Sequence, residues 1–191
     1  MSVDLSPYAL LELDEAKLAI KAGDNFTETD TLIAYINGVT DHIERYCGRV
    51  FLKRELTETF NGNNRPLHVL EHAPVYNTGE DVPTLTVDNV AISATVYKVD
   101  ATHGIIYLLS GVFTKGIQNC EIEYTTGYDT VPDGIRVAAI IVLTRLWRLR
   151  ENQTESVGSV TLEGQTIMFR ADTIPPEARA ILDGYRRVRF A

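Results

Sequence analysis

The apolar residues of this chain recur at helical spacing near both ends and alternate with polar residues in between. The longest helical pattern predicts a central helix over residues 132–150, because Pro132 suits the first turn of a helix. Apolar residues lie on nearly every side of it, so we expect burial on more than one side, in the core or between subunits. The residues expected in that position are Ile135, Ala139, Val142, Leu146 and Trp147.

Three other stretches have helical spacing. A short N-terminal helix is predicted to begin at Asp14, a good N-cap residue. A second helix, about five turns long, is predicted to begin at Thr27, which forms a capping-box pattern with Asp30. It has one apolar stripe and ends at Gly48, so we expect it to pack on the central helix. A last helix is predicted over residues 177–186, directly after two prolines.

From residue 50 to residue 125 the apolar residues alternate with polar ones, which is typical of strands with one buried face. The first of these strands runs from Leu52 to Phe60. A later alternating stretch, residues 157–170, predicts a hairpin with Glu163-Gly164 at its turn. The other predicted strands are Leu67–Leu70, Thr84–Val87, Thr95–Val99, Ile105–Leu109 and Cys120–Thr125.

These patterns predict the α+β class, with a small helical bundle and an inserted antiparallel β region. A chain of 191 residues is long enough for one large domain, so we predict a single domain over residues 1–191. Its helical core comprises residues 1–50 and 126–191, and the β-rich insertion covers approximately residues 51–125.

Composition and charge narrow the class of protein. No apolar run reaches membrane-spanning length and no basic region precedes an apolar N-terminal run, so we expect neither a membrane protein nor a secreted one. Cys47 and Cys120 are then expected to be reduced, buried thiols. Residues 1–135 hold 9 Lys or Arg against 20 Asp or Glu, whereas residues 136–191 hold 9 against 6. The acidic majority disfavours tight DNA binding. The basic end indicates a docking surface for an acidic partner, or simply helix ends with arginines.

The sequence contains no convincing motif for catalysis or metal binding. His68 and His72 would form a metal pair on a helix, but prolines on both sides indicate a strand or loop, where they would not converge. The stretch Asp24–Asp30 superficially resembles a calcium loop, yet the glycine and the final glutamate that such a loop needs are missing. Neither a phosphate-binding loop nor a nucleophile elbow is present. We therefore expect no enzyme activity, no metal and no cofactor.

Four segments carry a family resemblance through their order and spacing. They begin with LDEAKLAIKAG and TETDTLIAYINGVTDHIERYCGRVF, followed by CEIEYTTGYDTVPDGIRVAAIIVLTRLWRLR. ESVGSVTLEGQTIMFR and IPPEARAILDGYRRVRFA complete the series. Together they resemble the head–tail connector proteins of tailed bacteriophages, also called adaptor or head-completion proteins. Residues 61–118 depart from the shorter family members. The motif residues are Tyr46, Gly48, Arg49, Phe51, Tyr124, Gly127, Tyr128, Val131, Pro132 and Arg150.

The resemblance implies a structural protein without catalysis. Such proteins form a ring beneath the portal protein, extend the DNA channel, and join the head to the next neck or tail protein. It also implies a homo-oligomeric ring, twelvefold in the virion, and is compatible with a monomer in isolation. DNA would pass through the channel without sequence-specific binding. The location implied is the virion neck, reached after assembly in the host cytoplasm.

The end of the chain combines aromatic residues with arginines, which are common hot-spot types at protein interfaces. We hypothesise that this segment docks into the portal. The residues of this predicted portal-binding segment are Tyr185, Arg186, Arg187, Arg189 and Phe190.

Two other functions remain open at this point. One is another neck or tail component, such as a stopper or a tail terminator. The other is a β-rich ligand- or carbohydrate-binding module, although Tyr76, Tyr97 and Tyr107 are scattered rather than clustered along the sequence.

Overall fold

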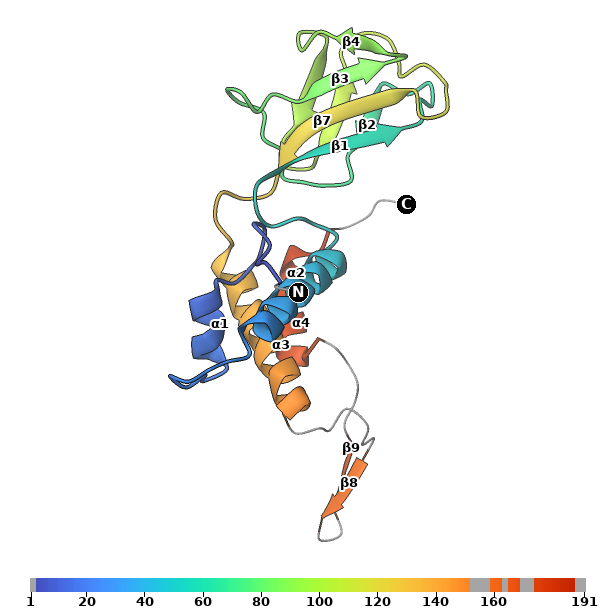
Figure 1. Cartoon of the computed structure of the whole chain (residues 1–191). Coiled ribbons are helices and arrows are strands. Elements are labelled where there is room, and N and C mark those ends of the chain that lie inside the picture. Colours follow the sequence, from blue (N-terminus) through green and yellow to red (C-terminus); the bar gives the residue numbers. More distant parts are fainter. Residues whose placement is uncertain (1–2, 152–158, 163–164, 169–173, 188–191) are drawn as a thin grey trace. The chain divides into compact units, whose positions relative to one another are not determined.

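The structure, a computed structural model, describes residues 3–151, 159–162, 165–168 and 174–187. It divides the chain into two compact units (Figure 1). The helical unit contains residues 1–47 and 131–191, and the β unit contains residues 48–130. Helices and antiparallel sheets occur together, which confirms the predicted α+β class. The prediction that the whole chain works as one domain stays a prediction.

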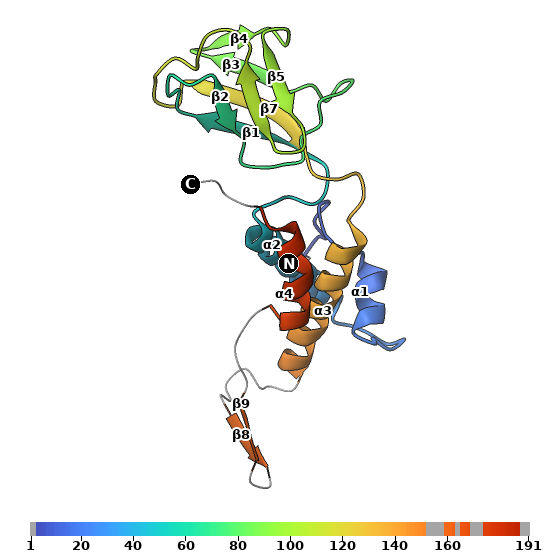
Figure 2. The ribbon, with the colours of Figure 1, turned by 180° about the vertical axis from the view of Figure 1, so that it is seen from behind.

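The helical unit contains α1 (Leu13–Ala19), α2 (Thr29–Cys47), α3 (Asp133–Glu151) and α4 (Pro176–Leu182). A 3-10 helix, η2 (Asp183–Tyr185), continues α4. The helices α2 and α3 each contact the three other helices, so together they form the centre of this unit (Figures 1 and 2).

Two predicted helix starts are wrong by a small margin. The N-cap of α1 is Glu12 rather than Asp14, which lies in the first turn. The capping box at Thr27 and Asp30 does not form, because α2 begins at Thr29 and the Leu32 N–H donates to the Glu28 carbonyl, 3.0 Å away. Both helices therefore begin next to acidic residues, which the positive end of a helix dipole favours.

Seven strands form two sheets in the β unit. The four-stranded sheet has the order β1 (Arg54–Phe60), β7 (Cys120–Thr126), β3 (Thr84–Val87) and β4 (Val90–Ile92). The three-stranded sheet has the order β2 (Leu67–Val69), β6 (Ile105–Leu108) and β5 (Tyr97–Asp100). All pairs are antiparallel, as predicted.

Two details of the predicted strands are wrong. The first strand begins at Arg54 rather than at Leu52, which instead makes an isolated bridge with Tyr128. The strand β4 was not predicted, because it is only three residues long and follows Asp88-Asn89 immediately. Both of those residues have positive φ angles, as the two central positions of a tight hairpin turn require.

The alternation in β1, β3 and β7 directs one side of each strand into a shared core between the two sheets. On β7, for example, Cys120, Ile122 and Tyr124 are buried whereas Glu121 and Glu123 are exposed. Apolar residues from both sheets and their loops complete this core, which consists of Phe60, Leu70, Val75, Leu85, Tyr97, Ile106, Phe113, Cys120, Ile122 and Tyr124.

The predicted hairpin after α3 is confirmed as far as its strands are concerned. The strands β8 (Ser159–Leu162) and β9 (Gln165–Met168) pair antiparallel. The predicted turn at Glu163-Gly164 lies outside the described residues.

Candidate interaction surfaces

The central helix α3 is buried on one side and open to solvent on another. The buried side includes Ile135, Ala139, Val142 and Trp147. Leu146 is half-buried. On the open side, Val137 is 47 % exposed, and the two isoleucines at 140 and 141 are half-buried. We predicted that α3 is buried on more than one side, and within one chain this burial is incomplete. That the open side of α3 contacts another subunit stays a prediction.

Trp147 anchors the last turns of α3 in the helical unit. Its ring contacts Phe26 and Tyr35, with centroid separations of 5.9 and 5.6 Å. Its Nε1–H donates to Glu151 at 3.0 Å. The Arg150 guanidinium lies 4.9 Å from the ring centre, and both of its terminal nitrogens donate to Glu28, at 2.9 and 2.7 Å. This cluster fixes the loop before α2 onto the end of α3.

The predicted portal-binding segment begins against the end of α2. The Tyr46 hydroxyl donates to Asp183 at 2.6 Å, which raises the pKa of that hydroxyl. The guanidinium of Arg186 lies 5.2 Å from the centre of the Tyr46 ring, and its Nη1 is 4.0 Å from the Asp183 carboxylate. The Arg187 N–H donates to the carbonyl of Cys47, the last residue of α2. Near the end of the described residues, α2 thus positions Asp183, Arg186 and Arg187.

The five predicted docking residues differ in their surroundings. Tyr185 packs at Gly134, where an added β-carbon would lie only 2.9 Å from the tyrosine hydroxyl. Arg186 is exposed and Arg187 is half-buried. Arg189 and Phe190 lie outside the described residues.

The two sequence motifs around residues 46–51 and 124–128 meet at the edge of the β unit. The Tyr128 N–H donates to the Phe51 carbonyl, and the Lys53 N–H donates to the Tyr128 carbonyl. Gly127 has a φ of 106°, and an added β-carbon would lie 2.5 Å from the Leu52 carbonyl oxygen. Arg49 donates to the Ala73 carbonyl at 3.1 Å. The motif residues therefore hold together the two segments through which the chain enters and leaves the β unit.

A half-buried carboxylate, Glu58, lies between the two sheets and was not identified from the sequence. It accepts hydrogen bonds from His68 Nε2 at 3.0 Å, from the Glu71 N–H at 2.8 Å and from the Tyr124 hydroxyl at 3.1 Å. Burial by itself raises the pKa of Glu58, but these hydrogen bonds outweigh burial and lower it below the ordinary value. In the alternating sequence of β1, Glu58 lies on the same face as Leu56 and Phe60. That position in the alternation is the feature of the sequence from which its burial could have been predicted.

His68 lies in β2, as the strand predicted over Leu67–Leu70 implies, and its ring stacks on Phe60 with centroids 3.5 Å apart. In the described part of the chain, no three His, Cys, Asp or Glu side chains are grouped so that they could hold a metal ion. None of the described helices is long and apolar enough to cross a membrane.

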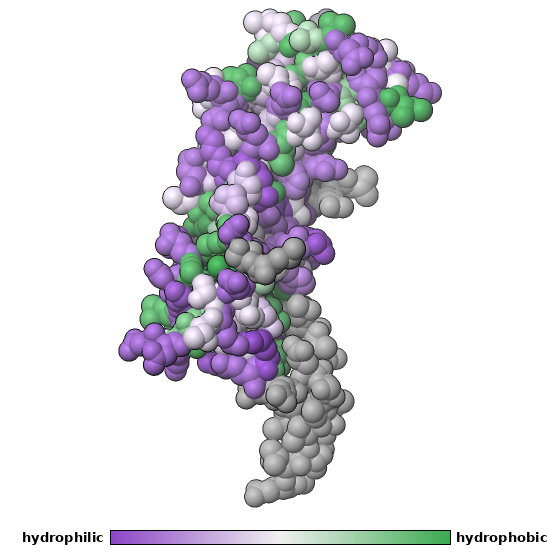
Figure 3. Space-filling model, in the orientation of Figure 1, coloured by the Kyte–Doolittle hydropathy of each residue, from purple (hydrophilic) through white to green (hydrophobic). Residues whose placement is uncertain are grey.

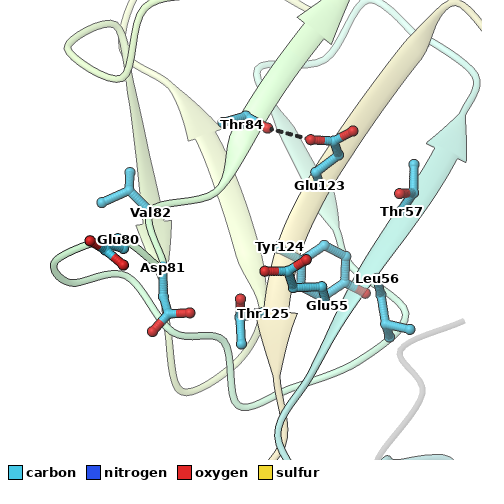
Figure 4. A pocket seen from close by; sticks show the side chains of 10 residues that line it. All are labelled: Glu55, Leu56, Thr57, Glu80, Asp81, Val82, Thr84, Glu123, Tyr124 and Thr125. Carbon is cyan, nitrogen blue, oxygen red and sulfur yellow. Dashed lines mark hydrogen bonds between the residues drawn. The ribbon is translucent and has the colours of Figure 1, made fainter.

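The two sheets of the β unit expose opposite kinds of surface. The outer face of the four-stranded sheet is formed by glutamates and threonines, and it is largely hydrophilic in Figure 3. A pocket of about 440 Å³ opens there, lined among others by Glu55, Glu80, Asp81 and Glu123 (Figure 4). Asp81 pairs with Lys53 at 2.8 Å, which lowers the pKa of the Asp81 carboxyl. A surface of this charge repels phosphates.

The outer face of the three-stranded sheet is apolar instead. Leu67 lies opposite Tyr107 and Val69 opposite Ile105 in the register of β2 and β6. Because these four residues alternate with the half-buried His68 and the buried Ile106, they share the outer side. Sequence patterning did not predict this face, since it assumed one apolar side per strand.

The fold is shared with neck components of gene transfer agent (GTA) particles. The chain is 17 % identical to a chain in the neck of an empty GTA particle with C6 symmetry, with a TM-score of 0.67. It is 16 % identical to a chain in the virion of the native particle, with a TM-score of 0.68. For the neck of the native particle with C12 symmetry, the identity is 15 % and the TM-score 0.64. Each match covers 100 % of this chain and 96 % of the other.

A protein-family model described as "Head completion protein" matches residues 9–188. This chain belongs to the head completion protein family, and the predicted resemblance is thereby confirmed. No curated protein matches the chain.

Proposed function

We propose that this protein is a structural, non-catalytic head–tail connector of a tailed phage or phage-like particle. In this proposal it forms a closed ring beneath the portal protein, extends the DNA channel and presents a surface to the next neck or tail protein. Two observations carry the proposal together: residues 9–188 match the head completion protein family, and the whole chain shares its fold with chains of particle necks.

A ring needs contacts between neighbouring copies, and the helical unit has a surface suited to such a contact. Val137 and its half-buried neighbours leave one side of α3 apolar and open. In a closed ring each copy meets the next through two different surfaces, so this open side would face a different region of the neighbouring copy. The C12 symmetry of one similar neck supports a ring of twelve copies.

The acidic outer face of the four-stranded sheet is compatible with a channel through which DNA slides. Glu55, Glu121 and Glu123 on that face would repel the phosphate backbone rather than bind it. No sequence-specific DNA contact is part of the proposal.

The C-terminal segment is the proposed contact with the portal protein. Tyr46, Asp183 and Arg187 fix the start of this segment against α2. The exposed guanidinium of Arg186 is held over a tyrosine ring, where less side-chain freedom is lost on binding than for a mobile arginine. The residue directly before residues 188–191, Arg187, is thus held by a hydrogen bond to α2.

The test is portal binding by the full chain and by a variant that lacks Gly184–Ala191. We expect the deletion to abolish binding, and Arg186→Ala to weaken it about tenfold, as loss of an interface hot spot does. Arg148→Ala is the matched control, because Arg148 is also exposed but lies in the last turn of α3, whereas Tyr185 packs at the first turn. Unchanged binding after the deletion would refute docking through this segment.

The ring itself is tested separately, by electron microscopy of the full chain mixed with its portal. A ring stacked coaxially on the portal supports the connector role. Binding only to a complex that already carries another neck protein would favour a stopper or terminator, the nearest alternative.

A further inference from the structure

An exposed arginine near the end of the described residues has hydrogen-bond donors to spare. The side chain of Arg186 is 58 % exposed, and its Nη1 is 4.0 Å from the Asp183 carboxylate, at the outer limit of an ion pair. The same carboxylate oxygen already accepts a hydrogen bond from the Tyr46 hydroxyl at 2.6 Å. A guanidinium is a planar fork of N–H donors that matches the two oxygens of a carboxylate. Arg186 can therefore bind a further carboxylate, supplied by a partner.

Tyr46, in the last turn of α2, holds Arg186 in place. The Arg186 guanidinium lies over the Tyr46 ring, 5.2 Å from the ring centre. The Arg186 N–H donates to the Asp183 carbonyl at 3.3 Å, and the next N–H, that of Arg187, donates to the Cys47 carbonyl at 2.9 Å. The backbone and the guanidinium of Arg186 are thus both fixed to the end of α2. An arginine held in this way loses little conformational freedom when it binds a partner.

A second exposed arginine, Arg179, belongs to the same surface. It lies four positions before Asp183, and residues at this spacing share one side of a helix. The hydrogen bond to Asp183 raises the pKa of the Tyr46 hydroxyl, whereas Arg179 and Arg186 both lower it, so both positive charges lie near this hydroxyl. The exposed Glu177 is two positions from Arg179 and therefore lies on another side of α4.

We propose that Arg179 and Arg186 bind carboxylates of the portal protein, and that Tyr46 is the residue that positions Arg186. This inference rests on the proposed docking of the C-terminal segment, and it adds the chemistry that the partner presents. Protein carboxylates fit this surface better than DNA phosphates do, because Asp183 adds a negative charge beside Arg186. Binding to a DNA backbone depends on many cations along a surface, whereas one carboxylate needs only one guanidinium.

The first test measures binding of the full chain and its variants to the isolated portal protein. Arg186→Lys keeps the charge but loses the fork, so we expect binding to weaken about fivefold. Arg179→Ala removes one charged contact and should weaken binding about threefold. Arg45→Ala is the matched control and should bind normally, because Arg45 is an exposed arginine of α2 that already pairs with Asp41 at 2.5 Å.

The second test separates positioning by Tyr46 from a general effect on the fold. Tyr46→Ala should weaken portal binding about fivefold, and Tyr46→Phe, which keeps the ring beside the guanidinium, should restore most of it. In a chain that already carries Arg186→Ala, the change Tyr46→Ala should weaken binding less than about twofold, because the group that it positions is gone. Circular dichroism at the helical band checks that each variant is folded.

Normal binding by Arg186→Lys or by Arg179→Ala would overturn the proposal. Equal losses from Tyr46→Ala with and without Arg186 would refute positioning. Binding of the chain to random-sequence duplex DNA that is lost in Arg186→Ala would assign the surface to phosphates instead. If deletion of Gly184–Ala191 abolishes portal binding while the single variants bind normally, this inference fails and docking by the segment stands. If the unaltered chain does not bind the portal at all, the proposed docking fails first.

Discussion

Replacement of Trp147 by alanine tests the central position of α3 directly. The indole is 3 % exposed and lies between Phe26, Tyr35 and the Arg150 guanidinium. Removing a buried Trp side chain costs about 3–5 kcal/mol, and with its two aromatic contacts this site should lie near the middle of that range, at about 4 kcal/mol. The hydrogen bond to Glu151 adds little, since Glu151 is exposed and water can replace the indole.

The measurement is thermal unfolding followed by circular dichroism at the helical band. The four α-helices among the described residues all lie in the helical unit, so this signal reports on that unit. Fluorescence would not serve, because Trp147 is the only tryptophan in the chain. For a unit of this size, a loss of about 4 kcal/mol lowers Tm by roughly 15–30 °C.

Two controls separate packing from general disturbance of α3. Trp147→Phe keeps a ring beside Tyr35 and should cost less than half as much as the alanine variant. Val137→Ala removes an exposed apolar side chain from the same helix and should change stability by less than about 1 kcal/mol. If Trp147→Ala lowers Tm no further than Val137→Ala does, α3 is not the core helix that we describe.

Two further predictions concern the β unit and α2, each checked by scanning calorimetry. The pKa of Glu58 is lower in the folded state than its ordinary value of 4.5, so its stabilising contribution is complete above that value and is lost as the pH falls through the folded pKa. Glu58→Gln should therefore cost about 1–3 kcal/mol at pH 7 and flatten the acid dependence of stability; an unchanged acid dependence would contradict this. Gly127→Ala should destabilise the β unit by more than about 1 kcal/mol, whereas Gly38→Ala, in α2 with no heavy atom within 4 Å of the new β-carbon, should stabilise by about 0.5–1 kcal/mol. Equal effects of the two alanines would refute the strain assigned to Gly127.

The regular elements were predictable because each one repeats a single period over many residues. The helix α3 and the strand β7 both have long, consistent patterns, and the predicted ranges differ from the structure by no more than about two residues. Helix starts were less predictable. At α2, Thr27 and Glu28 are both near the first turn, and local backbone geometry rather than residue type decides which one caps it.

The candidate surfaces were predictable only where the residues that form them are close together in the sequence. The contact of Tyr46 with Asp183 joins residues 137 positions apart, which no spacing rule can reveal. The apolar face around Val69 was missed for a different reason. In β6 apolar residues lie on both sides of the strand, whereas in β2 the apolar Leu67 and Val69 face outward and His68 faces inward, so alternation alone does not show which side is covered.

The motif residues of the family resemblance have a physical reason to be where they are. The β unit begins at Gly48 and ends at Thr130, and the two segments at its ends pair through the backbone of Phe51 and Tyr128. Gly48 has a φ of 63°, which suits glycine directly after a helix, and Gly127 lies too close to a carbonyl to carry a side chain. These positions therefore restrict residue type through backbone geometry, whatever the unit binds. The proposed contact with the portal involves the exposed Arg186 instead, which is why the binding experiment alters that residue and leaves Gly48 and Gly127 intact.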